Sequence, residues 1–329
     1  MEMKLGEHIT VTLFGESHGP AVGALIDGFP AGEILDLEKL MEDMAMRKPG
    51  SGLASRRKES DKVEIMSGVY EGKTTGMPIL LLIKNEDAKS KDYSFLPNQP
   101  RPGHVDHLID MKTEGAADLR GGGSFSARLT AGLVAAGSLC RDLIPEEWVV
   151  EATIGALGGK EGDEGIALAE EARKNRDSLG SRVDLVIKGL PVGLGEPWFD
   201  GIEPVLARAL MSIPAARAVE FGRGVNAGLM RGSQHNDSWQ KDMTLAEGAD
   251  GALGGMASGA DLNVKITFKP PSGISLPQKT FNQSTNMMDE LVIKGRHDPV
   301  IAPRARPVVE AVTRLVLADL AVKGGYIDG

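Results

Sequence analysis

The sequence predicts a mixed α+β fold rather than a regular alternation of strands and helices. Alternating hydrophobic and polar residues, the pattern of a half-buried strand, recur in groups, and the strong helical patterns fall between these groups. In addition, 42 of the 329 residues are glycine, many of them clustered as in RGGGS (120–124). Such clusters indicate tight turns or backbone that approaches a ligand closely. No repeat or long linker divides residues 1–329, so we expect one domain.

Strands are expected where hydrophobic residues occupy every second position, because alternate side chains of a strand point to opposite faces of a sheet. LNVKITF (262–268) and RVDLVIK (182–188) show this alternation without interruption. Further candidates, rich in Val, Ile, Leu and Thr, are residues 8–14, 62–66, 78–83 and 148–154.

Helices are expected where hydrophobic residues recur at spacings of three and four. Residues 125–144 place such a stripe on one face. The last helix, about 307–322, opens with Pro307 in its first turn and ends before Gly324. The polar segment 84–100 is expected to be a loop. Other helix candidates are residues 36–46, 164–176 and 201–212.

Composition argues against several classes of protein. The net charge of −9 and the aromatic content of 4% disfavour a nucleic-acid-binding surface, which needs basic and stacking side chains. No apolar run approaches the roughly 18–20 residues of a membrane helix, and the N-terminal residues do not resemble a signal peptide. The one cysteine, Cys140, cannot form an intrachain disulfide. We therefore expect a soluble cytoplasmic protein with no membrane or nucleic-acid partner.

The positive charges are unevenly distributed. Five of them stand within a dozen residues that contain no carboxylate: Arg47, Lys48, Arg56, Arg57 and Lys58. A basic loop on an acidic protein suggests a local anion-binding site. The alternative is a solvated run of charges that binds nothing.

Two short motifs resemble active-site signatures but lack the surroundings that those signatures need. GESHG (15–19) matches the G-x-S-x-G nucleophile elbow, with Ser17 as nucleophile. That elbow must open a helix, whereas the residues that follow are rich in glycine and proline. GVYEGKT (68–74) is one residue short of a phosphate-binding P-loop, and a hairpin turn at Glu71-Gly72 explains it better. No G-x-G-x-x-G fingerprint supports a dinucleotide site.

Histidine is the informative residue type. HVDH (104–107) offers possible metal ligands, but no further Cys or His completes a zinc pattern, so we expect no metal. His18, His104 and His297 each lie in a glycine-containing polar loop beside ionisable groups. The pKa of histidine lies near neutrality, which makes it a natural proton donor. Together the three loops favour a site that binds anions and transfers protons.

Nine segments, in order and over about residues 5–320, together resemble the chorismate synthase family. They are GESHGPAVGALIDGFPAG (15–32), RKPG (47–50), EIMSGVYEGKTTGMPILLLIKNEDAKSKDY (64–93), RPGHVDH (101–107), LRGGGSFSAR (119–128), RGSQHND (231–237), GALGGMASG (251–259), KPPSGIS (269–275) and KGRHDPVIAPRARPVVEA (294–311).

This resemblance implies mostly antiparallel sheets that sandwich helices, as a β-α-β sandwich. It also implies a lyase that removes phosphate and the C6 proton from 5-enolpyruvylshikimate 3-phosphate in a 1,4-relationship. The product is chorismate, in the last common step of aromatic amino acid biosynthesis, and the reaction requires reduced FMN.

The resemblance implies roles for particular residues. His18 corresponds to the acid that meets the departing phosphate, and His104 to the residue that protonates or stabilises the reduced flavin. Asp298 corresponds to the residue that assists the flavin N5 in taking the C6 proton. The expected substrate-binding arginines are Arg47, Arg101 and Arg304.

The FMN contacts implied by the resemblance lie in glycine-rich turns and basic segments. Backbone amides in such turns can bind an anion, and basic side chains would add charge-assisted hydrogen bonds to phosphate or to the reduced flavin. The positions are Arg47, Ser124, Phe125, Ser126, Asn226, Ala227, Gly254, Lys269, Pro270, Pro271, Ser272, Gly273 and Arg296.

The chain departs from the family's pattern in its basic loop and in two flavin contacts, Gly273 and Ser124, the second of which is often arginine in relatives. Where many relatives have three arginines, Met46, Arg47 and Lys48 stand here, and Leu53 replaces a further arginine. Lysine lacks the bidentate fork of arginine, so we expect weaker contact with phosphate or NADPH. Gly273 stands where serine is usual, which removes one hydroxyl.

Two other functions are weighed against a lyase. A flavin oxidoreductase on the same scaffold would need a hydride-acceptor site, and no dinucleotide fingerprint is visible. A non-catalytic anion-binding module would be expected to lose its proton-transfer residues, and all three are present. Whether the protein reduces its own flavin with NADPH or depends on an external flavin reductase stays open, and the altered basic loop favours the second. The resemblance implies a homotetramer.

Overall fold

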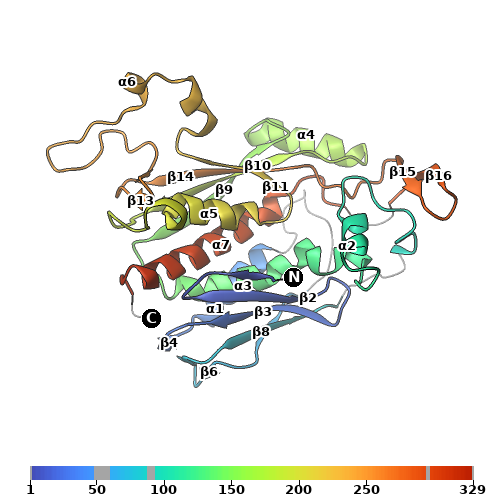
Figure 1. The fold of residues 1–329 in the computed structure, drawn as a ribbon, viewed down its shortest axis with the longest axis horizontal. Coiled ribbons are helices and arrows are strands. Elements are labelled where there is room, and N and C mark those ends of the chain that lie inside the picture. Colours follow the sequence, from blue (N-terminus) through green and yellow to red (C-terminus); the bar gives the residue numbers. More distant parts are fainter. Residues whose placement is uncertain (1, 48–59, 87–92, 294–296, 328–329) are drawn as a thin grey trace.

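Two antiparallel sheets enclose a layer of helices (Figure 1). The computed structural model describes residues 2–47, 60–86, 93–293 and 297–327. The five-stranded sheet has the order β1 (Lys4–Leu5), β2 (Thr10–Gly15), β3 (Ala21–Asp27), β8 (Ile79–Lys84), β5 (Val63–Ile65). The four-stranded sheet has the order β11 (Ala216–Phe221), β14 (Leu262–Phe268), β10 (Ser181–Lys188), β9 (Val149–Leu157). The expected α+β class, with antiparallel sheets around helices, is confirmed.

Three smaller sheets lie outside this sandwich. They are β4 (Ala31–Ile34) with β7 (Lys73–Thr75) and β6 (Val69–Tyr70), β12 (Ala252–Leu253) with β13 (Met256–Ala257), and β15 (Gln278–Asn282) with β16 (Met287–Leu291). The turn between β6 and β7 has positive φ at both central residues, 48° at Glu71 and 78° at Gly72, as a tight two-residue hairpin requires. The expected hairpin is therefore confirmed, and the segment does not cradle a phosphate.

The central helices are α3 (Thr130–Arg141) and α7 (Ala302–Lys323), which pack against each other between the sheets (Figure 1). α3 contacts β3 and β8, whereas α7 contacts β9 and β10. α3 is consequently buried on every side from Thr130 to Cys140. The remaining helices are α1 (Leu37–Met46), α2 (Asp106–Lys112), α4 (Gly162–Lys174), α5 (Ile202–Met211) and α6 (Gly232–His235). Among the described residues, no helix combines the length and apolar character needed to cross a membrane.

Two predicted helix starts were wrong. The helix expected from residue 125 begins at Thr130, because Ser126 is extended, with φ of −71° and ψ of 142°, and Ala127–Leu129 form a separate short 3-10 helix. The last helix begins at Ala302, five residues before the expected start, with Pro303 in its first turn. Pro307 therefore lies inside the helix and removes one backbone hydrogen bond. The burial of α7 between both sheets offsets that loss.

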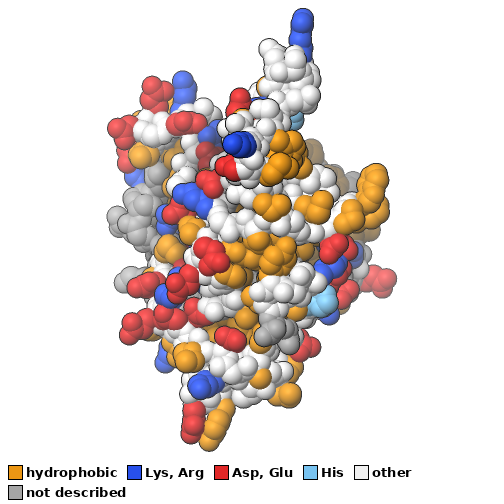
Figure 2. Space-filling view, turned by 90° about the vertical axis from the view of Figure 1, so that its left-hand side faces the viewer, with side chains coloured by type: hydrophobic (Ala, Val, Ile, Leu, Met, Phe, Trp, Pro, Cys, Tyr) orange, Lys and Arg blue, Asp and Glu red, His pale blue; other side chains and the backbone are white. Residues whose placement is uncertain are grey.

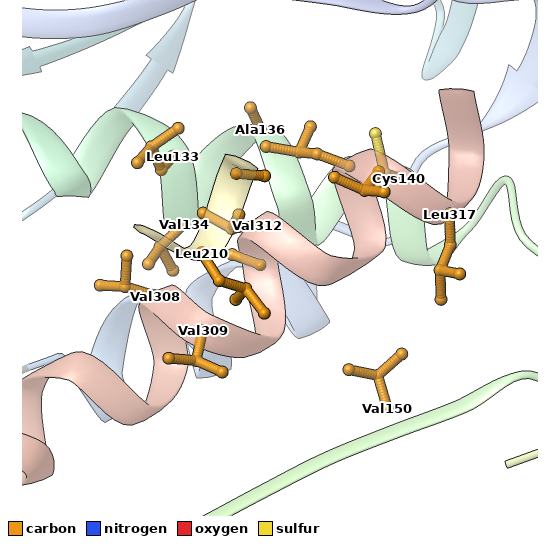
Figure 3. Packing of buried hydrophobic residues seen from close by; sticks show 14 of the residues in the cluster. Leu133, Val134, Ala136, Cys140, Val150, Leu210, Val308, Val309, Val312 and Leu317 are labelled. Atoms are coloured by element: carbon orange, nitrogen blue, oxygen red, sulfur yellow. The ribbon is translucent and has the colours of Figure 1, made fainter. Parts of the chain in front are cut away.

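The buried hydrophobic residues form one continuous cluster that includes both main sheets and the central helices. Figure 3 shows Leu133 and Cys140 of α3 beside Val312 and Leu317 of α7 in this cluster. Close packing of this kind excludes water from the interior of the cluster.

The Cys140 thiol is expected to be inert in the folded protein. It is fully buried, and burial raises its pKa to about 12, so almost no thiolate forms near neutrality. Iodoacetamide at about pH 8 should leave the native protein unlabelled but should label the urea-unfolded chain completely. Mass spectrometry of both samples checks this, and rapid labelling of the native protein would contradict the packing of α3.

Candidate active site

His18 lies in a tight turn between two strands of the five-stranded sheet. β2 ends at Gly15, the N–H of Gly19 donates to the carbonyl of Glu16 at 3.1 Å, and β3 follows. A strand rather than a helix therefore follows Ser17, which excludes the nucleophile elbow. The His18 ring meets the ring of Tyr93 edge-on, with 5.0 Å between centroids.

A run of three glycines passes directly beside two of the predicted histidines. Gly121, Gly122 and Gly123 have φ of 62°, 87° and 53°. A Cβ on Gly121 would lie 2.8 Å from His18 Cδ2, and a Cβ on Gly122 would lie 3.3 Å from His104 Cε1. Only glycine allows the backbone to come this close in this conformation. The run thus brings together two histidines that are 86 positions apart in the sequence.

His104 is held by a buried carboxylate. Its Nδ1 lies 2.7 Å from Asp106 Oδ1, and Arg101 donates to the same carboxylate from Nε at 2.7 Å and from Nη2 at 2.6 Å. Nδ1 also lies 3.0 Å from Arg101 Nη2, but its contact with Asp106 is shorter. An ionised carboxylate only accepts hydrogen bonds, so we assign the proton to Nδ1, which leaves Nε2 for chemistry. Burial opposes ionisation of Asp106, but the hydrogen bonds from Arg101 and His104 prevail and hold its pKa well below the usual value.

These contacts also bear on the metal alternative for HVDH. The carboxylate of Asp106 already accepts from Arg101 and His104, whereas His107 is exposed on α2. In the described ranges, no group of three or more His, Cys, Asp or Glu side chains is placed to hold a metal ion. The segment instead orients one histidine through a carboxylate.

Arg47 lies at the C-terminal end of α1 and points to the start of α3. Its Nη1 donates to Thr130 Oγ1 at 2.6 Å, and its Nε lies 3.7 Å from Asp61. Burial lowers the pKa of Arg47 to about 10, although Asp61 opposes the shift. The charges of Arg128 and Arg304 act in the same direction as burial.

These three guanidinium groups therefore lie near one another with few carboxylates among them. The buried Nε of Arg47 has no hydrogen-bond partner among the described residues. An unsatisfied buried donor is costly, and an anion placed among the arginines would satisfy it. Arg128 also pairs with Asp61, so one carboxylate serves two arginines.

The segment after β14 brings further predicted residues to the same place. Lys269 Nζ donates to the carbonyl of Gly103 at 2.7 Å, one residue before His104. Burial, and then the charge of Arg217, lowers the pKa of Lys269. A Cβ on Gly103 would lie 3.6 Å from Ser272 Cβ. Ser272 is thus adjacent to the His104 loop.

Asp298 connects this segment to the arginines. A Cβ on Gly273 would lie 3.1 Å from His297 Nδ1, and Asp298 pairs with Arg304 at 3.3 Å. Most of the predicted site residues are therefore linked in a ring, each to the next by a contact, by a charge interaction or by adjacency in the sequence. In order, its members are His104, Gly122, Gly121, His18, the 16–19 turn, Asn85, Arg128, Asp61, Arg47, Arg304, Asp298, His297, Gly273, Ser272 and Gly103.

Other predicted flavin contacts lie elsewhere in the chain. Asn226 and Ala227 follow β11 in the turn Gly224–Leu229, and Gly254 joins β12 to β13. Both turns lie at the Leu262 end of β14, whereas Lys269 follows its other end. Seven strand residues separate those ends by about 20 Å.

The flavin triplet and the altered basic loop are placed differently. Ser124 and Phe125 close the glycine run, and Ser126 caps the short helix Ala127–Leu129. Phe125 is exposed. Arg296, Lys48 and Leu53 lie outside the described residues.

Replacing Asp106 with Asn should destabilise the protein by about 3–5 kcal/mol at neutral pH, because it breaks a buried ion pair and leaves Arg101 uncompensated. The folded-state pKa of Asp106 is depressed. Its stabilisation is therefore complete above the unfolded-state pKa of about 3.9 and declines as pH falls below it. Urea unfolding should show a constant difference between wild type and variant from about pH 5 to 8, shrinking below about pH 4. A difference unchanged at about pH 3 would contradict this.

Four residues of the site were missed by the sequence analysis. Tyr93 contacts His18 and lies under the guanidinium of Arg101. Asn85 holds the His18 turn and Arg128, and Arg128 in turn pairs with Asp61. Most of these contacts join residues far apart in the sequence. Tyr93, Asn85 and Arg128 carried a signal, because they lie within segments of the resemblance, whereas Asp61 carried none.

The chain is similar to chorismate synthases over nearly its whole length. A family sequence model described as Chorismate synthase matches residues 9–322. Chorismate synthase of Aeropyrum pernix is 42% identical, over 96% of this chain and 92% of its own. That of Ralstonia pickettii is 41% identical, over 97% and 93%. A crystal structure of a chorismate synthase shares the fold, with a TM-score of 0.73 at 24% identity, over 97% of this chain and 93% of the other.

Proposed function

The chain belongs to the chorismate synthase family, and from this premise we propose that the residues around Gly121–Gly123 form its active site. The protein is a carbon–oxygen lyase of the shikimate pathway that converts 5-enolpyruvylshikimate 3-phosphate to chorismate and phosphate, and it requires reduced FMN. The observation that carries the site proposal is the approach of His18 and His104 to the same glycine run. One of these histidines is oriented by Asp106.

The residues of the site fit a flavin. The backbone of the glycine run lies directly against both histidine rings without a side chain between them, so a ligand beside the histidines could also approach this backbone closely. Ser124, Ser126 and Lys269 supply hydrogen-bond donors, and the exposed ring of Phe125 offers an apolar face. Reduced FMN, when bound, supplies transient electron density for cleavage of the C–O bond. We propose that Pro270, Pro271 and Gly273 shape the loop beside Ser272, and that Arg296 adds charge.

Substrate binding is assigned to the arginine cluster. The substrate carries a phosphate and two carboxylates, and Arg47 and Arg304 offer donors for such groups. Arg101 is committed to Asp106 and to the face of Tyr93. We therefore propose that Arg101 orients His104 and also contributes to substrate binding. Because Arg47 is buried, its interaction with an anion is stronger than the same interaction in bulk water.

Proton transfer is assigned to three groups. His18 protonates the phosphate as its C–O bond breaks, since a protonated imidazole donates readily near neutral pH. His104 uses Nε2, because Asp106 occupies Nδ1. Asp298, paired with Arg304, assists removal of the C6 proton, which the reduced flavin would take when bound. One proton and one phosphate leave, and no net oxidation occurs.

Asn226, Ala227 and Gly254 remain proposed flavin contacts although they lie at the other end of β14. Several hydrophobic side chains are exposed near that end, including Trp198 at 82% and Phe199 at 88%. Figure 2 shows hydrophobic side chains gathered on this side of the molecule. Such patches are typical of subunit contacts, which supports self-association, and the family resemblance leads us to propose a homotetramer of single-domain subunits. Sedimentation equilibrium tests the assembly, and a monomeric mass would contradict it.

We further propose that reduced flavin comes from an external flavin reductase rather than from NADPH bound to this chain. The support is the departure of the basic loop, with Met46, Lys48 and Leu53, from the arginines usual in relatives. Under anaerobic conditions NADPH alone should not bleach FMN on the protein, whereas photoreduction should. Rapid bleaching by NADPH alone would refute this.

Anaerobic turnover with photoreduced FMN tests the proposed active site. Phosphate release and the new diene absorbance are followed together in wild type and in His18→Ala. Wild type should release both products in equal amounts with reduced but not oxidised FMN, and His18→Ala should be strongly impaired. A variant with full turnover would place the chemistry elsewhere.

A further inference from the structure

Asn85 stands where the strand β8 ends, between the His18 turn and the arginine cluster. Its side-chain Nδ2 donates to the carbonyl of Glu16 at 3.0 Å and to that of Gly19 at 2.8 Å. Its Oδ1 accepts from Nε of Arg128 at 2.9 Å. The backbone N–H of Asn85 also donates to the carbonyl of Pro20 at 3.1 Å.

The orientation of this amide follows from its partners. The carbonyls of Glu16 and Gly19 can only accept, and the Nε of Arg128 can only donate. A rotated amide would place its NH2 against the arginine and its oxygen against two carbonyls, which leaves all three groups unsatisfied. The side chain therefore has one favourable arrangement.

The two carbonyls that Asn85 holds are the first and last of the turn that carries His18. The opposite side of the turn is held by Ser17, whose N–H donates to the carbonyl of Gly123 at 3.1 Å. The turn is thus fixed to β8 through Asn85 and to the glycine run through Ser17. Because β8 lies between β3 and β5 inside the five-stranded sheet, Asn85 transmits a rigid position to the turn.

The same amide fixes one member of the arginine cluster. Arg128 is 9% exposed, and it also contacts Asp61 and the carbonyl of Lys84, the latter at 3.3 Å. Lys84 directly precedes Asn85 in the chain, so the contacts of Arg128 with Asn85 and with Lys84 both come from the end of β8. The turn that carries His18 and Arg128 of the arginine cluster are therefore both held at the end of one strand.

We propose that Asn85 is a positioning residue for the elimination, which sets the His18 ring at a fixed distance from a phosphate bound by the arginines. This inference rests on the proposed role of His18 as acid. A displaced acid costs catalysis steeply, since an error of about 1 Å can lower a rate by about 10²-fold. Asn85 touches no reacting atom and acts through the turn and Arg128.

The Asn85→Ala variant is predicted to lower kcat about 10-fold or more while leaving the Kd for FMN, followed by fluorescence quenching, unchanged. Asn175, exposed at the end of α4, provides the matched control, because Asn175→Ala makes the same change outside the His18 turn and the arginine cluster. Should Asn85→Ala fail to fold, Asn85→Asp keeps an acceptor for Arg128 and removes only the two donors to the turn.

A double-mutant cycle with His18→Ala separates positioning from a structural defect. If Asn85 acts through His18, its replacement should cost little in the His18→Ala background, because the group that it positions is already absent. An equal loss of kcat in both backgrounds overturns the inference and leaves the acid role intact. Full turnover by His18→Ala alone overturns both.

Discussion

Replacement of His104 with alanine is expected to lower kcat with reduced FMN by about 10²-fold or more, the usual scale for a lost acid–base group. The Asp106 carboxylate accepts from Nδ1 of His104 at 2.7 Å, so Nε2 is the nitrogen directed to chemistry. Alanine removes that nitrogen, and the Asp106 carboxylate then pairs with Arg101 alone. The measurement is anaerobic phosphate release at saturating substrate, with photoreduced FMN.

His107, three positions further along, supplies the control. It is exposed, so His107→Ala removes an imidazole from the same segment without touching Asp106. Wild-type turnover is expected for this variant. An unimpaired His104→Ala would remove His104 from the mechanism, whereas a loss traced to weaker FMN binding would assign it to cofactor binding instead.

The sequence predicted the sheet architecture well because alternation is a local property. The strand expected at 262–268 is β14, and the one expected at 182–188 is β10 with one residue added. Helix starts were predicted less well. Hydrophobic spacing does not report the extended backbone of Ser126 ahead of α3, and the extension of α7 before Pro307 depends on packing between two sheets.

The residues of the site also differ in how well the sequence predicts them. His18, His104 and Asp298 stand in segments with distinctive residue types, which is why a resemblance could identify them. Asn85 and Asp61 are ordinary polar residues whose importance comes from partners that are distant in the sequence. A single sequence carries no record of such distances, so supporting residues appear only once the strands are paired.

The Gly121→Ala variant is expected to lower kcat by about 10²-fold while leaving the protein folded. Its Cβ would lie 2.8 Å from both His18 Cδ2 and Ser17 Oγ, closer than contact distance allows. The backbone there is held by neighbouring glycines, so the His18 ring must move. Alanine at φ of 62° also costs about 1–2 kcal/mol of stability.

A substitution at a second glycine separates the effect of backbone strain from the effect of displacing the His18 ring. Gly159 has φ of 80°, and a Cβ added there would meet no atom within 4 Å, so Gly159→Ala carries a similar backbone cost without a steric contact. Both variants should show similar shifts in urea midpoint, but only Gly121→Ala should lose activity. In a His18→Ala background the Gly121 substitution should have little further effect on kcat, because the ring that it displaces is gone. A full additional loss there would mean that the glycine run acts on the bound cofactor or on His104 rather than through His18.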